Sequence, residues 1–335
     1  MTRSLRLVAL AVALAAPALA QSGSLDAAVT AYGAGEWERA TALFAALAED
    51  PTASIGVREE ALRYLGRTHI ALNQRDEARQ SLDQLLALEP PLIEVDPEIE
   101  HPDLVRLYYE ARRDLQGGDY AVERADPGLT TLAILDFTNT SIDRYEAVDP
   151  LRQGLASMMI HTLNGATGLK VIERERIQWL LDELELQTES GAVDPATAVR
   201  AGKLLGATTV LFGAFTIQGE RMWISSRLVK VETGEILLAE QVFGTEEGLF
   251  ELVDELSLEV AQAVNATLDR ETVGERRDTS SLDAMMAYSE GLALLEAGDH
   301  DAAHARFEAA LEHDPTYTRA QSRVQSLQPA IAAAQ

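Results

Sequence analysis

The segment from Leu169 to Gln241 constrains the fold more than any other part of this 335-residue chain. Residues 170–172, which include the apolar Val171 and Ile172, predict a short strand. The apolar residues that follow recur at i, i+3, i+4 and i+7, and they are Ile177, Leu180, Leu181 and Leu184. That spacing predicts an amphipathic helix. Asp194 and Pro195 then predict the start of a second helix, as N-cap and first helical residue, and Gly206 suits a left-handed C-terminal cap.

Three strands joined by two tight turns follow in the same segment. The turns are expected at residues 218–221 and 232–235, where a glycine can adopt positive φ. One face of the middle strand carries Ile224, Ser226 and Leu228, and the other carries Trp223, Val229 and Val231. Since apolar residues occur on both faces, we expect both to be covered. The predicted fold is an α/β domain with a mixed sheet, an antiparallel meander and packed helices.

The motifs of this region, taken in order, resemble those of the CsgG-like family. They are Ile172-Glu173-Arg174, Ser190-Gly191, Leu205-Gly206-Ala207, Leu228-Val229 and Thr233-Gly234-Glu235-Ile236. The family includes the curli secretion channel, the flagellar protein FlgO and relatives of the TolB amino-terminal domain. The resemblance extends over residues 129–270 and implies an α/β periplasmic domain of cell-envelope assembly.

Helical repeats are predicted on both sides of this domain, in residues 24–50, 59–90 and 284–315. The last segment has the spacing of the roughly 34-residue tetratricopeptide unit, marked by Gly291, Ala303, Phe307, Ala310 and Pro315. Small alanines let two helices approach closely, and proline ends the second helix. The three segments resemble tetratricopeptide repeats. We expect residues 316–335 to add a helix that covers the open face of the last repeat.

These patterns predict six divisions of the chain. They are a signal peptide (1–20), a repeat domain (21–116), a linker (117–128), the CsgG-like α/β domain (129–270), a linker (271–281), and a C-terminal repeat with a capping helix (282–335). Glycine and proline mark the first linker, and dense charge marks the second.

The first twenty residues have the features of a secretory signal. Arg3 and Arg6 precede an apolar run over residues 7–16, and small residues end the segment at Ala20. We expect cleavage after Ala20 and localisation in the periplasm. The apolar run is shorter than the ~20 residues that span a bilayer, and no later run is long enough. We therefore expect no transmembrane segment after cleavage.

The chain contains no cysteine. Disulfides are therefore excluded, and stability must come from the apolar core. Many members of the resembled family are lipoproteins, but this chain lacks the cysteine that would carry a lipid. We expect any association with the outer membrane to be peripheral.

The formal net charge of −26 limits the classes of partner. The acidic residues are spread evenly along the chain, which is typical of a solvated surface. Nucleic acids and anionic lipid headgroups are disfavoured by such a surface. We expect the partners to be envelope or outer-membrane proteins.

The first helices of the repeats are expected to line a groove for a partner protein. The candidate groove residues are Arg63, Arg67, Ile70, Tyr288 and Leu292. Two arginines one turn apart can bind a partner's carboxylate. The same arginines can instead pair with Glu59 and Glu60 on their own helix. The sequence leaves both alternatives open.

A second candidate contact is the charge run that begins with Glu173 and Arg174. One interpretation is local pairing at a helix start. The other is a contact between copies of the chain, because the resembled family forms ring assemblies. A homo-oligomer is therefore one possible state.

No pattern in the sequence indicates catalysis. His300 and His304 lie one turn apart beside two aspartates, but two ligands do not close a metal site, and we assign them to solvated surface. Ser157 and His161 lack a nucleophile elbow, and Lys203 lacks the order of a phosphate-binding loop. We expect no catalytic residue, no cofactor and no metal.

The sequence therefore predicts a non-enzymatic periplasmic scaffold or accessory protein. Its role would be in cell-envelope or outer-membrane assembly and secretion, through protein–protein contacts. The alternative is a periplasmic regulator or binding module that recognises a small molecule or glycan in the α/β domain.

Overall fold

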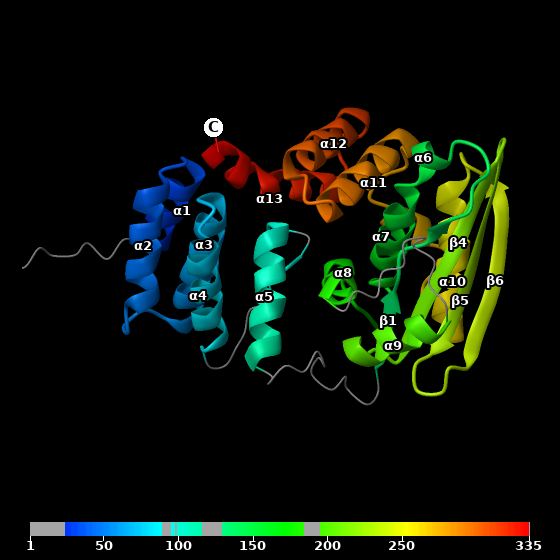
Figure 1. Cartoon of the computed structure of the whole chain (residues 1–335), viewed down its shortest axis with the longest axis horizontal. Helices are drawn as coiled ribbons and strands as arrows, with labels where there is room; N and C mark the ends of the chain where they lie inside the picture. The colour runs from blue at the N-terminus through cyan, green and yellow to red at the C-terminus, as the bar shows by residue number, and fades with distance from the viewer. Residues whose placement is uncertain (1–23, 89–94, 98, 116–128, 184–194, 335) are drawn as a thin grey trace, which may run out of the picture.

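The computed structural model describes residues 24–88, 95–97, 99–115, 129–183 and 195–334 (Figure 1). Five helices come first: α1 (Leu25–Gly33), α2 (Trp37–Glu49), α3 (Ile55–Ala71), α4 (Arg75–Leu86) and α5 (Pro102–Leu115). Side-chain caps set two of the starts. The Ser24 hydroxyl accepts from the Ala27 N–H at 3.2 Å, and the Ser54 hydroxyl accepts from the Val57 N–H at 3.4 Å.

The first four helices pack as two hairpins around small and aromatic residues. Ala40 and Ala78 are fully buried, which allows neighbouring helices to approach closely. Phe44 stacks on Tyr64 with ring centroids 5.0 Å apart, and Tyr64 meets Tyr32 edge-on at 5.2 Å. This confirms the helical repeats predicted from the sequence.

The strands form one mixed sheet. They are β1 (Thr130–Ile134), β2 (Thr138–Asn139), β3 (Leu169–Val171), β4 (Thr209–Gln218), β5 (Arg221–Lys230) and β6 (Ile236–Thr245). The order is β3-β1-β4-β5-β6, with β2 beside β4. β1 runs parallel to β3 and β4, and β4–β6 form the predicted antiparallel meander. Gly219 and Gly234 make its turns, with φ of +60° and +73°.

Helices lie on both sides of this sheet. They are α6 (Tyr145–Val148), α7 (Leu151–Leu163), α8 (Arg174–Glu183), α9 (Pro195–Leu205), α10 (Leu249–Ala263) and the 3-10 helix η1 (Val273–Arg276). α7 and α10 share an apolar core with one face of the sheet, while α8 and α9 share another core with the opposite face. Tyr109 of α5 packs on Trp179 of α8 with ring centroids 5.6 Å apart. The second core therefore continues into the N-terminal helices.

The expectation that both faces of the middle strand, β5, are covered is met on one face and only in part on the other, and the neighbouring edge strand β6 is exposed. Ile236, Leu237 and Phe243 of β6 are exposed, and Phe243 exposes 69% of its surface. α9 reaches the part of β5 near Val229, which is buried, but Trp223 at the other end of β5 is only half-buried. The helices α8 and α9 are too few and too short to extend over the outer strands.

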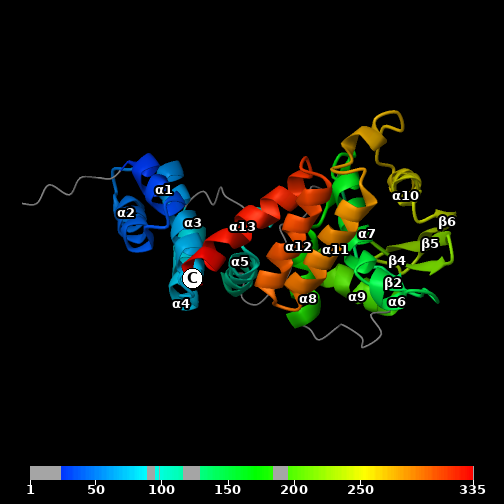
Figure 2. The same ribbon diagram turned by 90° about the horizontal axis from the view of Figure 1, so that it is seen from above.

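Three helices end the described chain: α11 (Leu282–Glu296), α12 (His300–His313) and α13 (Thr318–Ala334). α11 and α12 form the predicted repeat hairpin, with Ala303 and Phe307 fully buried between them. α11 also packs against α7 of the α/β domain. α13 covers α12, as predicted, and then continues to α3, so it bridges the two helical regions (Figure 2).

Several sequence predictions fall outside the described residues. They are the signal peptide with its cleavage at Ala20, the linker 117–128, the Ser190-Gly191 motif and the Asp194 cap. The domain limits stay a prediction. Among the helices that the structure describes, none has the length and apolar content needed to cross a membrane.

Candidate functional site

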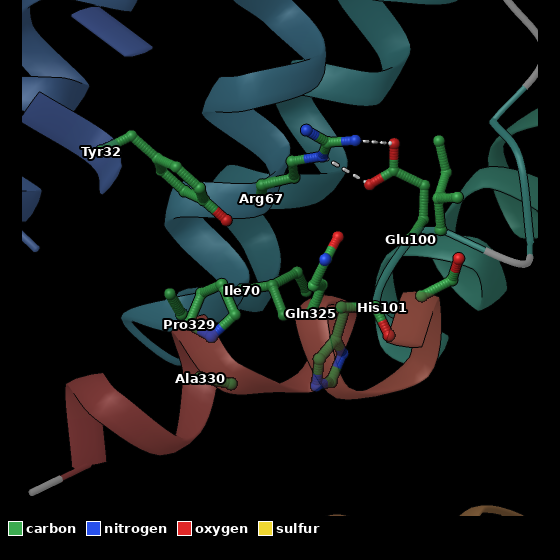
Figure 3. Close-up of a pocket in the computed structure, with 12 residues that line it drawn as sticks. Tyr32, Arg67, Ile70, Glu100, His101, Gln325, Pro329 and Ala330 are labelled. Atoms are coloured by element: carbon green, nitrogen blue, oxygen red, sulfur yellow. Dashed lines mark hydrogen bonds and ion pairs between the residues drawn. The ribbon is translucent and has the colours of Figure 1, made fainter. Parts of the chain in front are cut away.

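A cavity of about 320 Å³ lies between the N-terminal helices and α13 (Figure 3). Segment 99–101, just before α5, forms a third wall. The side chains around it include Tyr32, Arg67, Ile70, Gln325, Pro329 and Ala330. We call this cavity the repeat groove, and two of the three candidate binding residues on α3, Arg67 and Ile70, line it. It is bounded on one side by the chain's own C-terminal helix.

Arg67 in the repeat groove is already paired with a carboxylate of the same chain, that of Glu100. Arg67 donates two hydrogen bonds to Glu100, from Nε to Oε2 and from Nη2 to Oε1, each 2.6 Å long (Figure 3). The Glu100 side chain is 1% exposed. This is the bidentate geometry that makes arginine–carboxylate pairs strong. Burial raises the pKa of the nearby Tyr32 to about 12, so its phenol stays protonated and able to donate.

The other two candidate residues of α3 lie at the same place. Arg63 pairs with Glu60 at 2.6 Å, which is the local alternative recognised in the sequence. Its Nε lies 4.0 Å from the Glu100 carboxylate, is buried and has no hydrogen-bond partner. Ile70 lines the groove. The structure thus places Arg63 and Arg67 beside the Glu100 carboxylate, and Ile70 lines the same groove. The buried Nε of Arg63 is a hydrogen-bond donor that is not used.

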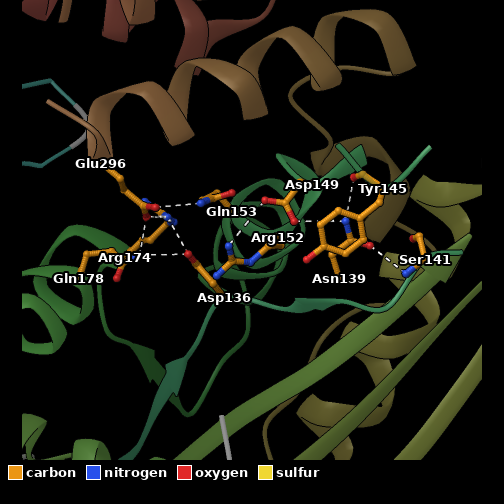
Figure 4. Close-up of polar contacts among 10 residues, drawn as sticks. All are labelled: Asp136, Asn139, Ser141, Tyr145, Asp149, Arg152, Gln153, Arg174, Gln178 and Glu296. Atoms are coloured by element: carbon orange, nitrogen blue, oxygen red, sulfur yellow. Dashed lines mark hydrogen bonds and ion pairs between the residues drawn. The ribbon is translucent and has the colours of Figure 1, made fainter. Parts of the chain in front are cut away.

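Arg174 lies at a buried junction between the α/β domain and the C-terminal repeat (Figure 4). Arg174 and Gln178 each donate to Asp136 at 3.0 Å, and both also donate to Glu296 of α11. Gln153 donates to Glu296 at 2.8 Å. Burial raises the pKa of Asp136 to about 6, against the opposing effect of the Arg174 guanidinium. In this structure Arg174 therefore makes its contacts within the chain.

A second cavity, of about 470 Å³, opens beside this junction. Glu173, Arg174 and Tyr288 lie on its wall together with His161 and Arg323. It adjoins the carboxyl end of β3, which is where open α/β sheets commonly bind ligands. The structure therefore brings the predicted oligomer contact residues close to Tyr288, which the sequence had assigned to a different surface.

Tyr288 and Leu292 are covered by other parts of the chain. They are 2% and 1% exposed, respectively. The Arg319 guanidinium of α13 lies 5.3 Å from the centre of the Tyr288 ring. Leu292 borders a cavity of about 100 Å³ between α5, α8 and α11.

Two segments of the chain match known families. Residues 123–222 match the family described as the curli production assembly/transport component CsgG. The central domain is CsgG-like. Residues 60–91 match a tetratricopeptide repeat, and this range covers most of α3 and all of α4. No curated protein matches the chain.

Parts of the chain are similar to solved structures at low sequence identity. TolB from Acinetobacter baumannii is 14% identical, with 42% of this chain and 29% of TolB covered and a TM-score of 0.29. The LpoB C-terminal domain from Escherichia coli is 18% identical, with coverages of 37% and 87% and a TM-score of 0.27. Lipoprotein GNA1162 from Neisseria meningitidis is 20% identical, with coverages of 41% and 97% and a TM-score of 0.31. The chain therefore spans less than a third of the TolB structure.

Sequence reasoning missed the residues that complete both sites. Glu100 belongs to a proline-rich connector that gives no periodic signal, and Glu296 lies near the end of α11. Arg319 and Arg323 in α13 are both buried, and Arg323 pairs with Glu175 of α8. Two arginines at i and i+4 on the apolar side of a capping helix were a signal that was available but was not used.

Proposed function

We propose that this chain is a non-enzymatic periplasmic scaffold or accessory protein of cell-envelope assembly. Its repeat groove would bind an acidic segment of a partner protein. The match to a curli assembly and transport family supports the envelope role, and the match to a tetratricopeptide repeat supports recognition of protein segments.

The pair between Arg67 and Glu100 is the observation that carries this proposal. The groove holds a carboxylate by two short hydrogen bonds, with the unused Arg63 Nε 4.0 Å away. Glu100 belongs to a connector rather than to the repeat itself. An acidic side chain or terminal carboxylate of a partner has the same chemistry and would compete with Glu100 for Arg67. The apolar wall at Ile70 and Pro329 would accept a neighbouring apolar residue.

Site-specific photo-crosslinking in native envelopes tests this proposal. A photoreactive residue at Ile70, inside the groove, should capture a partner that mass spectrometry identifies. The same residue at Arg39, whose exposed side chain on α2 is outside the groove lining, is the matched control. Arg67→Ala should reduce capture, and Glu100→Gln should increase it by weakening the competitor. Equal capture from Ile70 and Arg39 would contradict the proposal.

The CsgG-like domain supports a second type of contact, between copies of the chain. β6 is the outer strand of the described sheet and has exposed apolar residues. Arg174 is buried and paired within the chain, whereas Glu173 is half-buried at the second cavity. We therefore propose β6, rather than the Glu173–Arg174 run, as the first surface to test for self-association.

The second cavity supports the alternative function, recognition of a small molecule or glycan. It is larger than the repeat groove and is lined by polar groups that include His161, Asn164 and Arg323. A glycan array with the purified chain tests this function. Binding that is lost in His161→Ala but kept in Arg67→Ala would favour it over the scaffold role.

A further inference from the structure

Three potential metal ligands, which come from two distant segments of the sequence, meet beside the repeat groove. His101 lies just before α5, Asp103 is in the first turn of α5, and His300 begins α12. One donor atom of each residue lies within 4.8 Å of the other two. The rings of His101 and His300 meet edge-on with centroids 4.8 Å apart. The sequence paired His300 with His304, but the fold gives it these two other neighbours.

The distances are close to those of a metal site. Asp103 Oδ2 lies 3.7 Å from His101 Nδ1 and 3.9 Å from His300 Nδ1. In a tetrahedral zinc site, with bonds of about 2.0–2.1 Å, neighbouring donor atoms are about 3.3 Å apart. Small rotations of the Asp103 and His300 side chains, which are 44% and 26% exposed, would bring the three donors together.

His101 is buried, and its ring is only partly satisfied by hydrogen bonds. It is 6% exposed, and its Nδ1 accepts a 3.2 Å hydrogen bond from the Asp103 backbone N–H. Binding of a metal ion through Nδ1 would replace this hydrogen bond, because the nitrogen has a single lone pair. The His101 Nε2 is buried without a hydrogen-bond partner, which leaves the ring poorly satisfied.

We propose that His101, Asp103 and His300 form a binding site for a divalent transition metal ion such as zinc. Two imidazoles and one carboxylate suit zinc, whereas magnesium and calcium prefer oxygen ligands. The exposed side of Asp103 leaves room for water at the remaining position. The ion would fasten the segment that enters α5 to α12. Since Glu100 is next to His101, the same ion would also hold the Glu100 connector in the repeat groove.

The first experiment is thermal unfolding of the full mature chain, without a histidine tag, in the presence of micromolar zinc. Zinc should raise the Tm of the unaltered protein by about 2–5 °C. His300→Ala and Asp103→Asn, both at partly exposed positions, should abolish the shift. His304→Ala is the matched control, because His304 lies one turn further along α12 and pairs with Glu308. It should keep the shift, and magnesium should not replace zinc.

Cobalt provides a readout that does not depend on stability. Co²⁺ bound by His101, Asp103 and His300 should give visible absorption bands of a nitrogen- and oxygen-ligated site, and zinc should displace it. His300→Ala should lose these bands while retaining a normal circular dichroism spectrum. Absence of zinc binding, or an equal effect of zinc on the unaltered chain and on His300→Ala, would overturn the proposal. A shift that is lost in His304→Ala instead would also overturn it, by placing the metal at His304 and Glu308.

Discussion

Arg67 and Glu100 are 33 residues apart in sequence, yet they share two hydrogen bonds of 2.6 Å in the wall of the repeat groove. The pair joins the first repeat region to the connector that leads into α5. It also places one of the chain's own carboxylates where a partner's carboxylate is proposed to bind. Its removal should therefore affect both stability and binding.

The first prediction concerns the stability of this pair. Glu100→Ala should lower the free energy of unfolding by about 3 kcal/mol, because it leaves the half-buried Arg67 without its counterion. Urea denaturation measures the change. Arg39→Ala, which removes an exposed pair with Glu36, is the control and should change little. Similar losses of unfolding free energy in Glu100→Ala and Arg39→Ala would show that the Arg67–Glu100 pair stabilises the chain no more than an exposed pair does.

The second prediction concerns the contact between α7 and α11. Gly154 of α7 faces Ser289 and Met285 of α11, and a Cβ at this position would collide with the Ser289 hydroxyl and lie 2.7 Å from Met285 Cε. Gly154→Ala should destabilise the chain by about 1–3 kcal/mol through overpacking. Gly56→Ala on α3, where a Cβ meets nothing within 4 Å, should instead be neutral or stabilising. Ser289→Gly should partly rescue Gly154→Ala in thermal melts.

The third prediction concerns pH. Burial raises the pKa of Asp136 to about 6 in the folded chain, from 3.8 in the unfolded chain. The folded state therefore binds more protons between these values, and the contribution of Asp136 to stability is present below pH 3.8 and is lost as the pH rises through 6. The full effect is roughly 3 kcal/mol. The stability of Asp136→Asn relative to the unaltered chain should rise by most of this amount between pH 4 and pH 7. A pH-independent difference would show that Asp136 has an ordinary pKa.

The sequence predicted local structure well because each element has its own periodic signal. The 3.6-residue spacing around Leu180 placed α8, and the glycines at 219 and 234 placed the turns of the meander. Contacts between distant segments have no such signal. Neither Glu100 beside Arg67 nor His101 beside His300 follows from any spacing, since both depend on how the segment before α5 packs against α3 and α12.

The lack of a sequence signal for contacts between distant segments also explains why one face of β5 is covered only in part. The apolar residues on both faces of β5 predicted two covering layers, but the extent of a layer depends on the number and length of the helices available. Trp223 and Val229 are both apolar residues on the same face of β5. Only Val229, however, lies under α9. An uncovered apolar strand edge is thus a property that sequence alone did not reveal, and it leads to the last prediction.

We expect β6 to mediate self-association by pairing with β6 of a second copy. Phe243 and Trp223 are cross-strand neighbours on the open face, and Phe243 is 69% exposed. β6 pairs only with β5 among the described strands, and its ten residues include one charged side chain, Glu240. Natural sheets usually protect such an edge with charge, and lysine is the commonest choice.

Sedimentation velocity over a range of protein and salt concentrations tests this expectation. The net charge of −26 should oppose pairing at low ionic strength, so association should strengthen as salt screens the repulsion. Phe243→Lys should weaken association at least about tenfold, equivalent to about 1.4 kcal/mol. Ile142→Lys, at a position that is 70% exposed in a loop outside β6, is the matched control and should leave association unchanged. If both lysine variants associate as the unaltered chain does, contact occurs elsewhere, and if the unaltered chain is monomeric at every concentration and salt, β6 has no such role.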